Sequence, residues 1–319
     1  MELSVVAAAR EGSPFSEPLN IAVVADRLGF GEVWAGEGPT WDCFALATAI
    51  GLSTKQIDIT AGPLPVSVRD PSSIIRGAAS TAFLTGRRVG IALGASSRRV
   101  VEGFHGVSRA GVTSVLEETA RVLRTRLSAP TPGDDTPSEH GFRRILPSPA
   151  GLLTVAAFGD RAISVAARFA DRMVLDLVTP EQVATLRRKL VDASHAADRT
   201  PPVLAAWLPA AVDPQPGAED QILSSIVGYL AVPGYSDMFE AAGFGEAVSR
   251  ARADGNKSEL LELLPAGASA TLGLVGGLDD IRDRLRTYAE AGLDEIAVVP
   301  ATVGDPSGTR TLTALTSLL

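Results

Sequence analysis

The stretch that decides the fold is residues 88–107, R-V-G-I-A-L-G-A-S-S-R-R-V-V-E-G-F-H-G-V. Residues 89–93 are a short apolar run beside glycines, which is typical of a strand buried on both faces. Small residues follow at 94–97 and let backbone N–H groups and hydroxyls approach a ligand closely. A buried strand that opens into such a loop is a common place for a ligand in an α/β protein, although an ordinary strand-to-helix connection has the same pattern.

The same alternation of strand and helix extends along the whole chain. Apolar runs predict strands, and amphipathic stretches with capping signals predict helices between them. Gly29 ends the first predicted helix, and Asp70 followed by Pro71 begins the third. The predicted strands are residues 3–8, 32–35, 57–61, 89–93, 153–157, 173–177, 203–211 and 295–299, and the predicted helices are 17–28, 42–52, 70–83, 112–126, 161–169, 179–195 and 278–291.

This order predicts an α/β fold, the (β/α)8 TIM barrel, over the 319 residues. A doubly wound sheet is the competing arrangement, but no G-x-G-x-x-G fingerprint follows the first predicted strand. A junction in which a helix ends at a glycine and the next strand begins with a glutamate recurs at residues 29–33 and 292–296. Repeated β/α units require such a recurrence.

We expect a single domain over residues 1–319 with two interruptions of the repeat. Residues 128–151 carry five prolines and predict a Pro-rich excursion after the fourth helix. Residues 212–273 are too long for one connection and predict a helical insertion after the seventh strand, near the barrel mouth. Within the insertion, the predicted helices are residues 221–230, 236–252 and 258–264.

The composition favours a soluble, cytoplasmic enzyme. A content of 45% hydrophobic residues can bury a large core, and the single cysteine, Cys43, excludes an internal disulfide. With three histidines the chain cannot build a dense Cys/His zinc site, and we expect no metal. The formal charge of −8 argues against nucleic acid as a partner, and no apolar run reaches membrane-spanning length. Motifs of α/β-hydrolases and phosphate-binding loops are missing.

Several motifs together resemble the luciferase-like oxidoreductases. These are V-W-A-G-E at residues 33–37, T-A-G-P-L-P at 60–65 and V-V-E-G-F-H-G-V at 100–107. The last of them resembles a motif after the fourth strand in the branch that uses the deazaflavin coenzyme F420. Further similarity at residues 155–162, V-A-A-F-G-D-R-A, and at 276–300 extends the resemblance over nearly the whole chain.

The resemblance implies an enzyme that transfers a hydride between coenzyme F420 and a small organic substrate, and it implies a homodimer. An FMN-dependent luciferase-like monooxygenase is one alternative. A non-catalytic binding or scaffold protein with a degenerate site is another, since the chain departs from the family pattern. It has Gly94-Ala95-Ser96-Ser97 where Gly-Val-Ser-Gly-Pro is common, and Gly38 where some relatives have histidine.

The expected cofactor site lies at the carboxyl ends of the second to fifth strands. Following the resemblance, we expect a cis Gly62–Pro63 bond in a bulge behind the cofactor ring, where proline lowers the cost of the cis form. Gly159 begins a helix whose free N–H groups can receive a phosphate, although Asp160-Arg161 replaces the family's Pro-Lys. The expected cofactor-binding residues are Glu37, Ala61, Gly62, Pro63, Gly94, Ala95, Ser96, Ser97, Phe158, Gly159, Asp160 and Arg161.

The expected catalytic residues are Glu37, Trp41 and His105. A carboxylate such as Glu37 at a barrel mouth can hold a cofactor hydroxyl or transfer a proton, and a solvated loop acid is its structural alternative. Trp41 could stack near the ring, whereas an aromatic residue at a helix start is more often part of the core. For His105 a structural hydrogen-bonding role is favoured over catalysis. The proton is therefore expected to move through Glu37, a water or the substrate.

Overall fold

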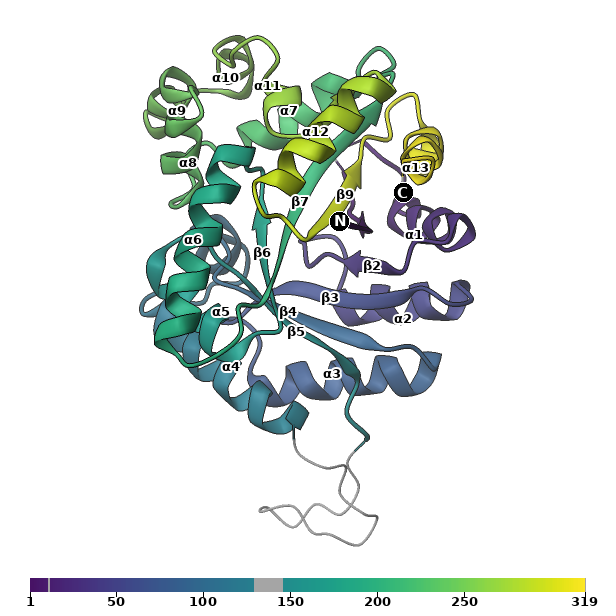
Figure 1. Cartoon of the computed structure of the whole chain (residues 1–319), viewed down its shortest axis with the longest axis vertical. Coiled ribbons are helices and arrows are strands. Elements are labelled where there is room, and N and C mark those ends of the chain that lie inside the picture. Colours follow the sequence, from purple (N-terminus) through teal and green to yellow (C-terminus); the bar gives the residue numbers. More distant parts are fainter. Residues whose placement is uncertain (11, 129–145, 319) are drawn as a thin grey trace, which may run out of the picture.

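The computed structural model describes residues 1–10, 12–128 and 146–318, which form a closed parallel barrel surrounded by helices (Figure 1). The barrel strands pair in chain order, and β9 closes the barrel between β7 and β1. The predicted (β/α)8 barrel is confirmed. The strands are β1 (Glu2–Ala7), β2 (Glu32–Ala35), β3 (Asp58–Pro65), β4 (Val89–Gly94), β5 (Ala150–Ala156), β6 (Arg172–Asp176), β7 (Val203–Val212) and β9 (Glu295–Pro300). A short additional strand, β8 (Leu274–Gly276), pairs with the end of β7.

Helices between the strands cover the outside of the barrel (Figure 1). Several begin at the residues that the capping signals predict: the Asp70 side chain accepts hydrogen bonds from Ser72 and Ser73 N–H, and Thr179 forms a capping box with Gln182. Each such cap contributes about 1 kcal/mol because it satisfies free N–H groups of the first turn. The helices are α1 (Glu17–Leu28), α2 (Cys43–Ser53), α3 (Pro71–Thr85), α4 (Val112–Ser128), α5 (Asp160–Phe169), α6 (Pro180–Ala196), α12 (Leu278–Glu290) and α13 (Thr309–Thr316).

The segment after β7 forms five helices, α7 (Ala218–Val227), α8 (Tyr235–Ala241), α9 (Gly245–Arg252), α10 (Lys257–Glu262) and α11 (Ala268–Thr271). Their apolar side chains form a core of their own around Phe239 and Phe244. The prediction of one helix over residues 236–252 is wrong: Gly243 adopts φ 93°, a left-handed conformation that separates α8 from α9. The Pro-rich residues 129–145 lie outside the described residues.

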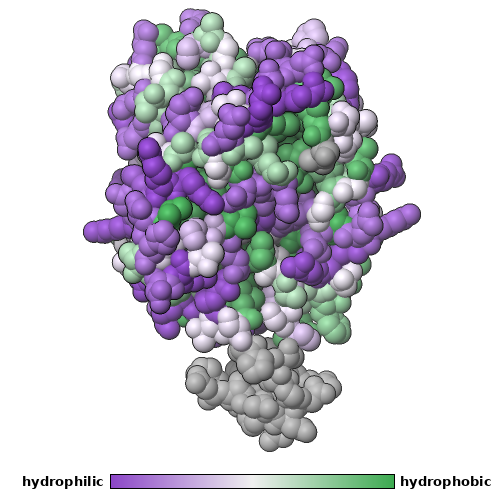
Figure 2. Space-filling model, in the orientation of Figure 1, coloured by the Kyte–Doolittle hydropathy of each residue, from purple (hydrophilic) through white to green (hydrophobic). Residues whose placement is uncertain are grey.

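Two apolar layers result from the alternation of side chains along each strand. One set of side chains packs under the helices, and the other fills the barrel interior, where Val6, Trp34, Val174 and Ala205 form a separate cluster. Full burial of a large aliphatic side chain contributes about 1.5–3 kcal/mol, so both layers stabilise the fold. On the face seen in Figure 2, hydrophilic and apolar residues are interspersed. None of the helices in the described ranges has the length and apolarity needed to cross a bilayer.

A polar network around Arg172 fills the amino-terminal end of the interior. Arg172 is 1% exposed and donates hydrogen bonds to Glu32 Oε2 at 2.6 Å and Glu295 Oε2 at 2.7 Å. Its guanidinium lies 4.2 Å from the centroid of the Trp34 ring. Burial lowers the pKa of Arg172, but its hydrogen bonds and the charges of both glutamates outweigh this and raise it above its usual value. These contacts join β2, β6 and β9 across the barrel axis.

Candidate active site at the carboxyl-terminal mouth

The carboxyl ends of the barrel strands form one mouth with two contrasting sides. On the side of β2 to β4 the residues are small: Gly36 follows β2, Gly62 lies within β3 and Gly94 ends β4. On the opposite side, Asp176 ends β6 and Trp207 lies beside it in β7, because these two residues are register partners. Small residues let a flat ligand approach the backbone. The hydrogen-bonding residues Asp176 and Trp207 lie on the other side of the mouth, on β6 and β7.

The Gly62–Pro63 peptide bond is cis and lies in a bulge of β3. The register with β4 shifts between Ala61 and Leu64. Gly62 has φ 118°, and a Cβ added to it would lie 2.4 Å from the carbonyl oxygen of Ala92, so only glycine fits this position. The predicted cis bond and bulge are confirmed, whereas the position of a cofactor ring against them stays a prediction.

The loop after β4 is held by contacts with the residues that follow it. Ser96 has a positive φ of 54°, which is uncommon outside glycine, and its carbonyl accepts a hydrogen bond from Arg109 Nε at 2.8 Å. Ser97 Oγ accepts a hydrogen bond from the N–H of Val100 at 3.3 Å. A hydroxyl that accepts in this way keeps its own hydrogen for another acceptor. Ser97 can therefore still donate to a ligand at the mouth.

Glu37 is held between α2 and the segment before α3. Arg69 Nη2 lies 2.9 Å from one carboxylate oxygen of Glu37 and 3.2 Å from the other, and the N–H of Cys43 donates to Oε2 at 3.1 Å. Arg69 also donates to Asp42 at 2.6 Å. The Glu37 side chain is 9% exposed. These contacts make Glu37 a fixed, ion-paired carboxylate, and its part in proton transfer stays a prediction.

The other two expected catalytic residues lie nearer to solvent. Trp41 is 38% exposed and precedes α2. His105 follows a π-helical turn, η1 (Arg99–Phe104), and its ring meets the Phe104 ring edge to face at 4.8 Å. Turns of this kind are frequent at functional sites. The sequence analysis missed this turn because no residue pattern separates it from an ordinary helix start.

The amino-terminal turn of α5 is open to solvent. Gly159 is the N-cap residue and provides no side-chain cap, so the first N–H groups of the helix are free for a ligand. Asp160 pairs with Lys189 at 2.8 Å, whereas the exposed Arg161 has no ionic or hydrogen-bonding partner among the described residues. Free N–H groups together with an unpaired guanidinium form an arrangement that favours an anion.

A polar cluster that the sequence analysis missed lies at the end of β6. The Tyr235 hydroxyl donates to Asp176 Oδ2 at 2.8 Å. Burial raises the pKa of Asp176 to about 6, and burial together with the charge of Asp176 raises the pKa of Tyr235. The charge of Asp176, more than burial, raises the pKa of Tyr229 to about 12. A signal was available, since Asp176 ends an otherwise apolar run, but its aromatic partners come from the distant insertion.

Two tryptophans lie next to this cluster in the barrel interior. The rings of Trp34 and Trp207 meet edge to face with centroids 5.6 Å apart. Trp207 Nε1 is buried and makes no hydrogen bond among the described residues. A buried donor without an acceptor costs about 1–3 kcal/mol, so an oxygen atom of a bound ligand would relieve that cost.

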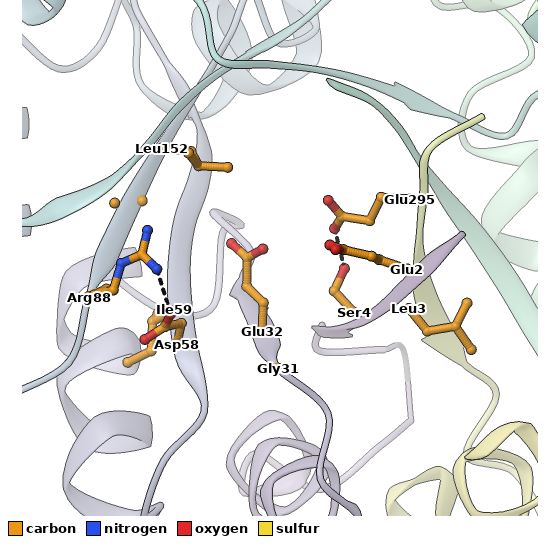
Figure 3. Close-up of a pocket in the computed structure, with 12 residues that line it drawn as sticks. Glu2, Leu3, Ser4, Gly31, Glu32, Asp58, Ile59, Arg88, Leu152 and Glu295 are labelled. Atoms are coloured by element: carbon orange, nitrogen blue, oxygen red, sulfur yellow. Dashed lines mark hydrogen bonds and ion pairs between the residues drawn. The ribbon is translucent and has the colours of Figure 1, made fainter. Parts of the chain in front are cut away.

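A hollow of about 230 Å³ lies at the opposite end of the barrel. Figure 3 shows the side chains of Glu2, Glu32 and Glu295 pointing toward it. Glu32 and Glu295 are paired with Arg172, and Glu295 also accepts a hydrogen bond from Ser4 at 2.5 Å. The active sites of TIM-barrel enzymes lie at the carboxyl-terminal face of the barrel. Because its buried carboxylates are already paired, we assign this hollow to the stability of the barrel and the active site to the mouth.

Comparison with known families agrees with this fold. The sequence model of the luciferase-like monooxygenase family matches residues 1–295. The chain belongs to the luciferase-like monooxygenase family. It is therefore an enzyme of an oxidoreductase family. A relative from Mycobacterium tuberculosis, provisionally named a coenzyme F420-dependent oxidoreductase, is 22% identical over 331 aligned residues, covering 92% of this chain and 93% of the relative.

Solved structures share the luciferase-like fold at low sequence identity. An F420-dependent secondary alcohol dehydrogenase in complex with an F420–acetone adduct has a TM-score of 0.78 and 15% identity, covering 100% of this chain and 98% of the other. The F420-dependent tetrahydromethanopterin reductase of Methanopyrus kandleri has a TM-score of 0.80 and 15% identity, with 100% and 99% covered. A type II Baeyer–Villiger monooxygenase from Pseudomonas putida in complex with FMN has a TM-score of 0.69 and 17% identity, with 99% and 96% covered.

Proposed function

We propose that the chain is a coenzyme F420-dependent oxidoreductase that transfers a hydride between the deazaflavin and a small organic substrate. The observation that carries this proposal is the combination, at one mouth, of the small-residue side around Gly62 and Gly94 with the open first turn of α5, where Arg161 has no partner among the described residues. The relative from Mycobacterium tuberculosis that is provisionally named an F420-dependent oxidoreductase supports it.

The residues of the mouth suit F420. Its flat ring would lie against Gly62–Pro63 and the loop of residues 94–97, with Ser97 free to donate to a polar ring atom. Its phosphate would be held by the first N–H groups of α5 and by Arg161. When bound, the deazaflavin supplies a ring carbon that accepts or donates a hydride, and it lacks the nitrogen through which flavins react readily with oxygen. The protein then fixes the ring face against the substrate.

Under this proposal the remaining expected residues take supporting places. Glu37 lies near the edge of the ring, oriented by Arg69. Phe158 precedes the first turn of α5 and contacts Tyr235 of the insertion at a centroid distance of 4.8 Å. Asp160 is exposed and paired with Lys189, which leaves Arg161 as the basic group for the phosphate.

The second candidate is an FMN-dependent monooxygenase, favoured by the FMN-bound Baeyer–Villiger monooxygenase that shares the fold. A non-catalytic protein with a degenerate site is the third. The test is a titration of the protein with F420 and, separately, with FMN, followed by cofactor fluorescence and by calorimetry. We expect saturable binding of F420 and weaker or no binding of FMN. Binding of FMN alone would replace the proposal with the monooxygenase, and binding of neither would favour the degenerate site.

A further inference from the structure

The mouth contains an ionisable pair that the cofactor-binding residues do not use. Asp176 is the last residue of β6 and is half-buried, and Tyr235 begins α8 in the insertion. The two side chains are joined by the 2.8 Å hydrogen bond from the tyrosine hydroxyl to Asp176 Oδ2. The end of a barrel strand is where TIM-barrel enzymes carry catalytic groups. The pair therefore faces the same space as the proposed cofactor site.

The position of the Asp176 carboxyl group is fixed by its surroundings. Leu177, the next residue, has a φ of 53°, in the left-handed region that favours glycine, and its N–H donates to the carbonyl of Trp207 at 3.2 Å. The Tyr235 ring packs against Phe158 and Tyr229, with centroids 4.8 and 4.7 Å away. Backbone strain of this kind persists where the surrounding structure holds it, and it is common at active sites.

The charged and titratable groups that face Asp176 are Arg10, Tyr229 and Tyr235, from the segments after β1 and α7 and from α8. Arg10 is held by a 2.6 Å hydrogen bond from Nη1 to Ser225 Oγ. Burial raises the pKa of Asp176 to about 6, against the opposing effects of the Tyr235 hydrogen bond and the Arg10 charge. A carboxyl group with such a pKa is present in both protonation states near neutral pH, as general acid–base chemistry requires.

Two hydrogen-bonding residues lie at neighbouring positions of the mouth on adjacent strands. Asp176 and Trp207 are register partners on adjacent strands, and Trp207 Nε1 is a buried donor without an acceptor among the described residues. An indole N–H only donates, while a carboxyl group donates when protonated and accepts when ionised. A carbonyl oxygen, or the hydroxyl of the corresponding alcohol, matches this pair.

We propose that Asp176, positioned by Tyr235, is the proton-transferring residue for a substrate of the alcohol–carbonyl class; this inference rests on the proposed function. In the oxidative direction the C–H bond of the alcohol breaks and its hydride leaves to the deazaflavin. The O–H bond breaks as well, its proton passes to the Asp176 carboxylate, and its electron pair forms the C=O π bond. The alcohol is thereby oxidised and the deazaflavin reduced, and carbonyl reduction is the reverse. Glu37, ion-paired with Arg69, is the rival proton carrier.

The first test needs no cofactor. Aspartate is labelled with ¹³C at its side-chain carboxyl, and the spectrum of the protein is followed from pH 4 to 8. We expect one carboxyl that titrates near pH 6, is missing in Asp176→Asn, and titrates at higher pH in Tyr235→Phe, because the tyrosine hydrogen bond lowers the pKa of Asp176. Asp58→Asn is the matched control: burial also raises the pKa of Asp58, at the opposite end of the barrel, so this variant should leave the Asp176 signal unchanged. The lack of such a signal overturns the proposal.

The second test measures turnover of reduced F420 with acetone and cyclohexanone. Asp176→Asn should lower turnover by about 10²–10⁴-fold with little change in F420 affinity, and Tyr235→Phe should shift the pH profile upward. Near-normal turnover of Asp176→Asn, or loss of turnover in Glu37→Gln alone, overturns the assignment while the proposed function stands. Failure of the wild type to bind F420 overturns the proposed function itself.

F420 binding without turnover of either ketone overturns the proposed substrate class. Thermal melts confirm that each variant is folded.

Discussion

At the scale of single residues, the mouth contains two carboxylates with different surroundings. Glu37 is bound by a guanidinium and a backbone N–H, whereas Asp176 is surrounded by aromatic rings and accepts a hydrogen bond from a phenol. Environments that differ in this way give two carboxylates of one site separate roles. We therefore expect Glu37 to orient other groups and Asp176 to change its protonation state.

The protonation of Asp176 should be visible in the stability of the protein. Its pKa in the folded chain is about 6 and its ordinary value is 3.8, so the fold favours the protonated form. That contribution is fully present below about pH 4 and is lost as the pH rises through about 6. The Asp176→Asn variant has no carboxyl group to titrate at this position, so it cannot lose this contribution. The melting temperature of the variant relative to the wild type should rise between pH 4 and 7, and two parallel melting curves would contradict this.

At the scale of elements, the network of Arg172 ties three strands together. The substitution Arg172→Met should destabilise the protein by about 3–5 kcal/mol, because Glu295 would stay buried without its partner. Arg88→Met is the matched control, since Arg88 is 62% exposed and pairs with Asp58 at 3.6 Å at the same end of the barrel. Denaturant unfolding of both variants measures the difference. A loss for Arg172→Met as small as that of the control would mean that the network contributes little.

The first turn of α5 gives a second prediction at this scale. Arg161→Ala should weaken binding of complete F420 by about tenfold, the effect of losing one charge-assisted contact with a phosphate. Binding of a deazaflavin that lacks the phosphate tail should not change. Arg188→Ala, an exposed arginine on α6, is the control. Equal weakening of both ligands, measured by calorimetry, would show that this turn is not the phosphate site.

The order of elements could be predicted from the sequence because it depends on local patterns. Apolar runs fixed the barrel strands, and caps such as Asp70 and Thr179 fixed helix starts. The long-range side-chain contacts at the two ends of the barrel could not be found in this way. Asp176 and Tyr235 are 59 residues apart in sequence, and Arg172 and Glu32 are 140 apart. Nothing local encodes such contacts, which arise only when the barrel closes.

At the scale of the whole molecule, we predict a homodimer through the ends of α2 and α3. Leu52 and Phe83 are each 67% exposed and Leu84 is 62% exposed. The two helix ends lie side by side, since a Cβ added to Gly51 would be 2.6 Å from the side chain of Thr85. An exposed apolar patch of this kind favours association.

The double substitution Leu52→Lys and Phe83→Lys should convert the dimer into a monomer in sedimentation experiments, because it places charges in the interface. Phe15→Lys is the matched control: Phe15 is 76% exposed and precedes α1, away from the patch, so the dimer should persist. A wild-type chain that sediments as a monomer at micromolar concentration would refute the prediction.

The positions of the tryptophans have an optical consequence. The chain has three tryptophans. Trp34 lies in β2, Trp41 just before α2 and Trp207 in β7. Excitation at the red edge of protein absorption selects indole, so the emitted light comes only from this part of the molecule. A ligand that absorbs in the near ultraviolet or blue and enters the mouth would quench it by energy transfer. The intrinsic tryptophan fluorescence of the unlabelled protein therefore reports whether such a ligand occupies the mouth.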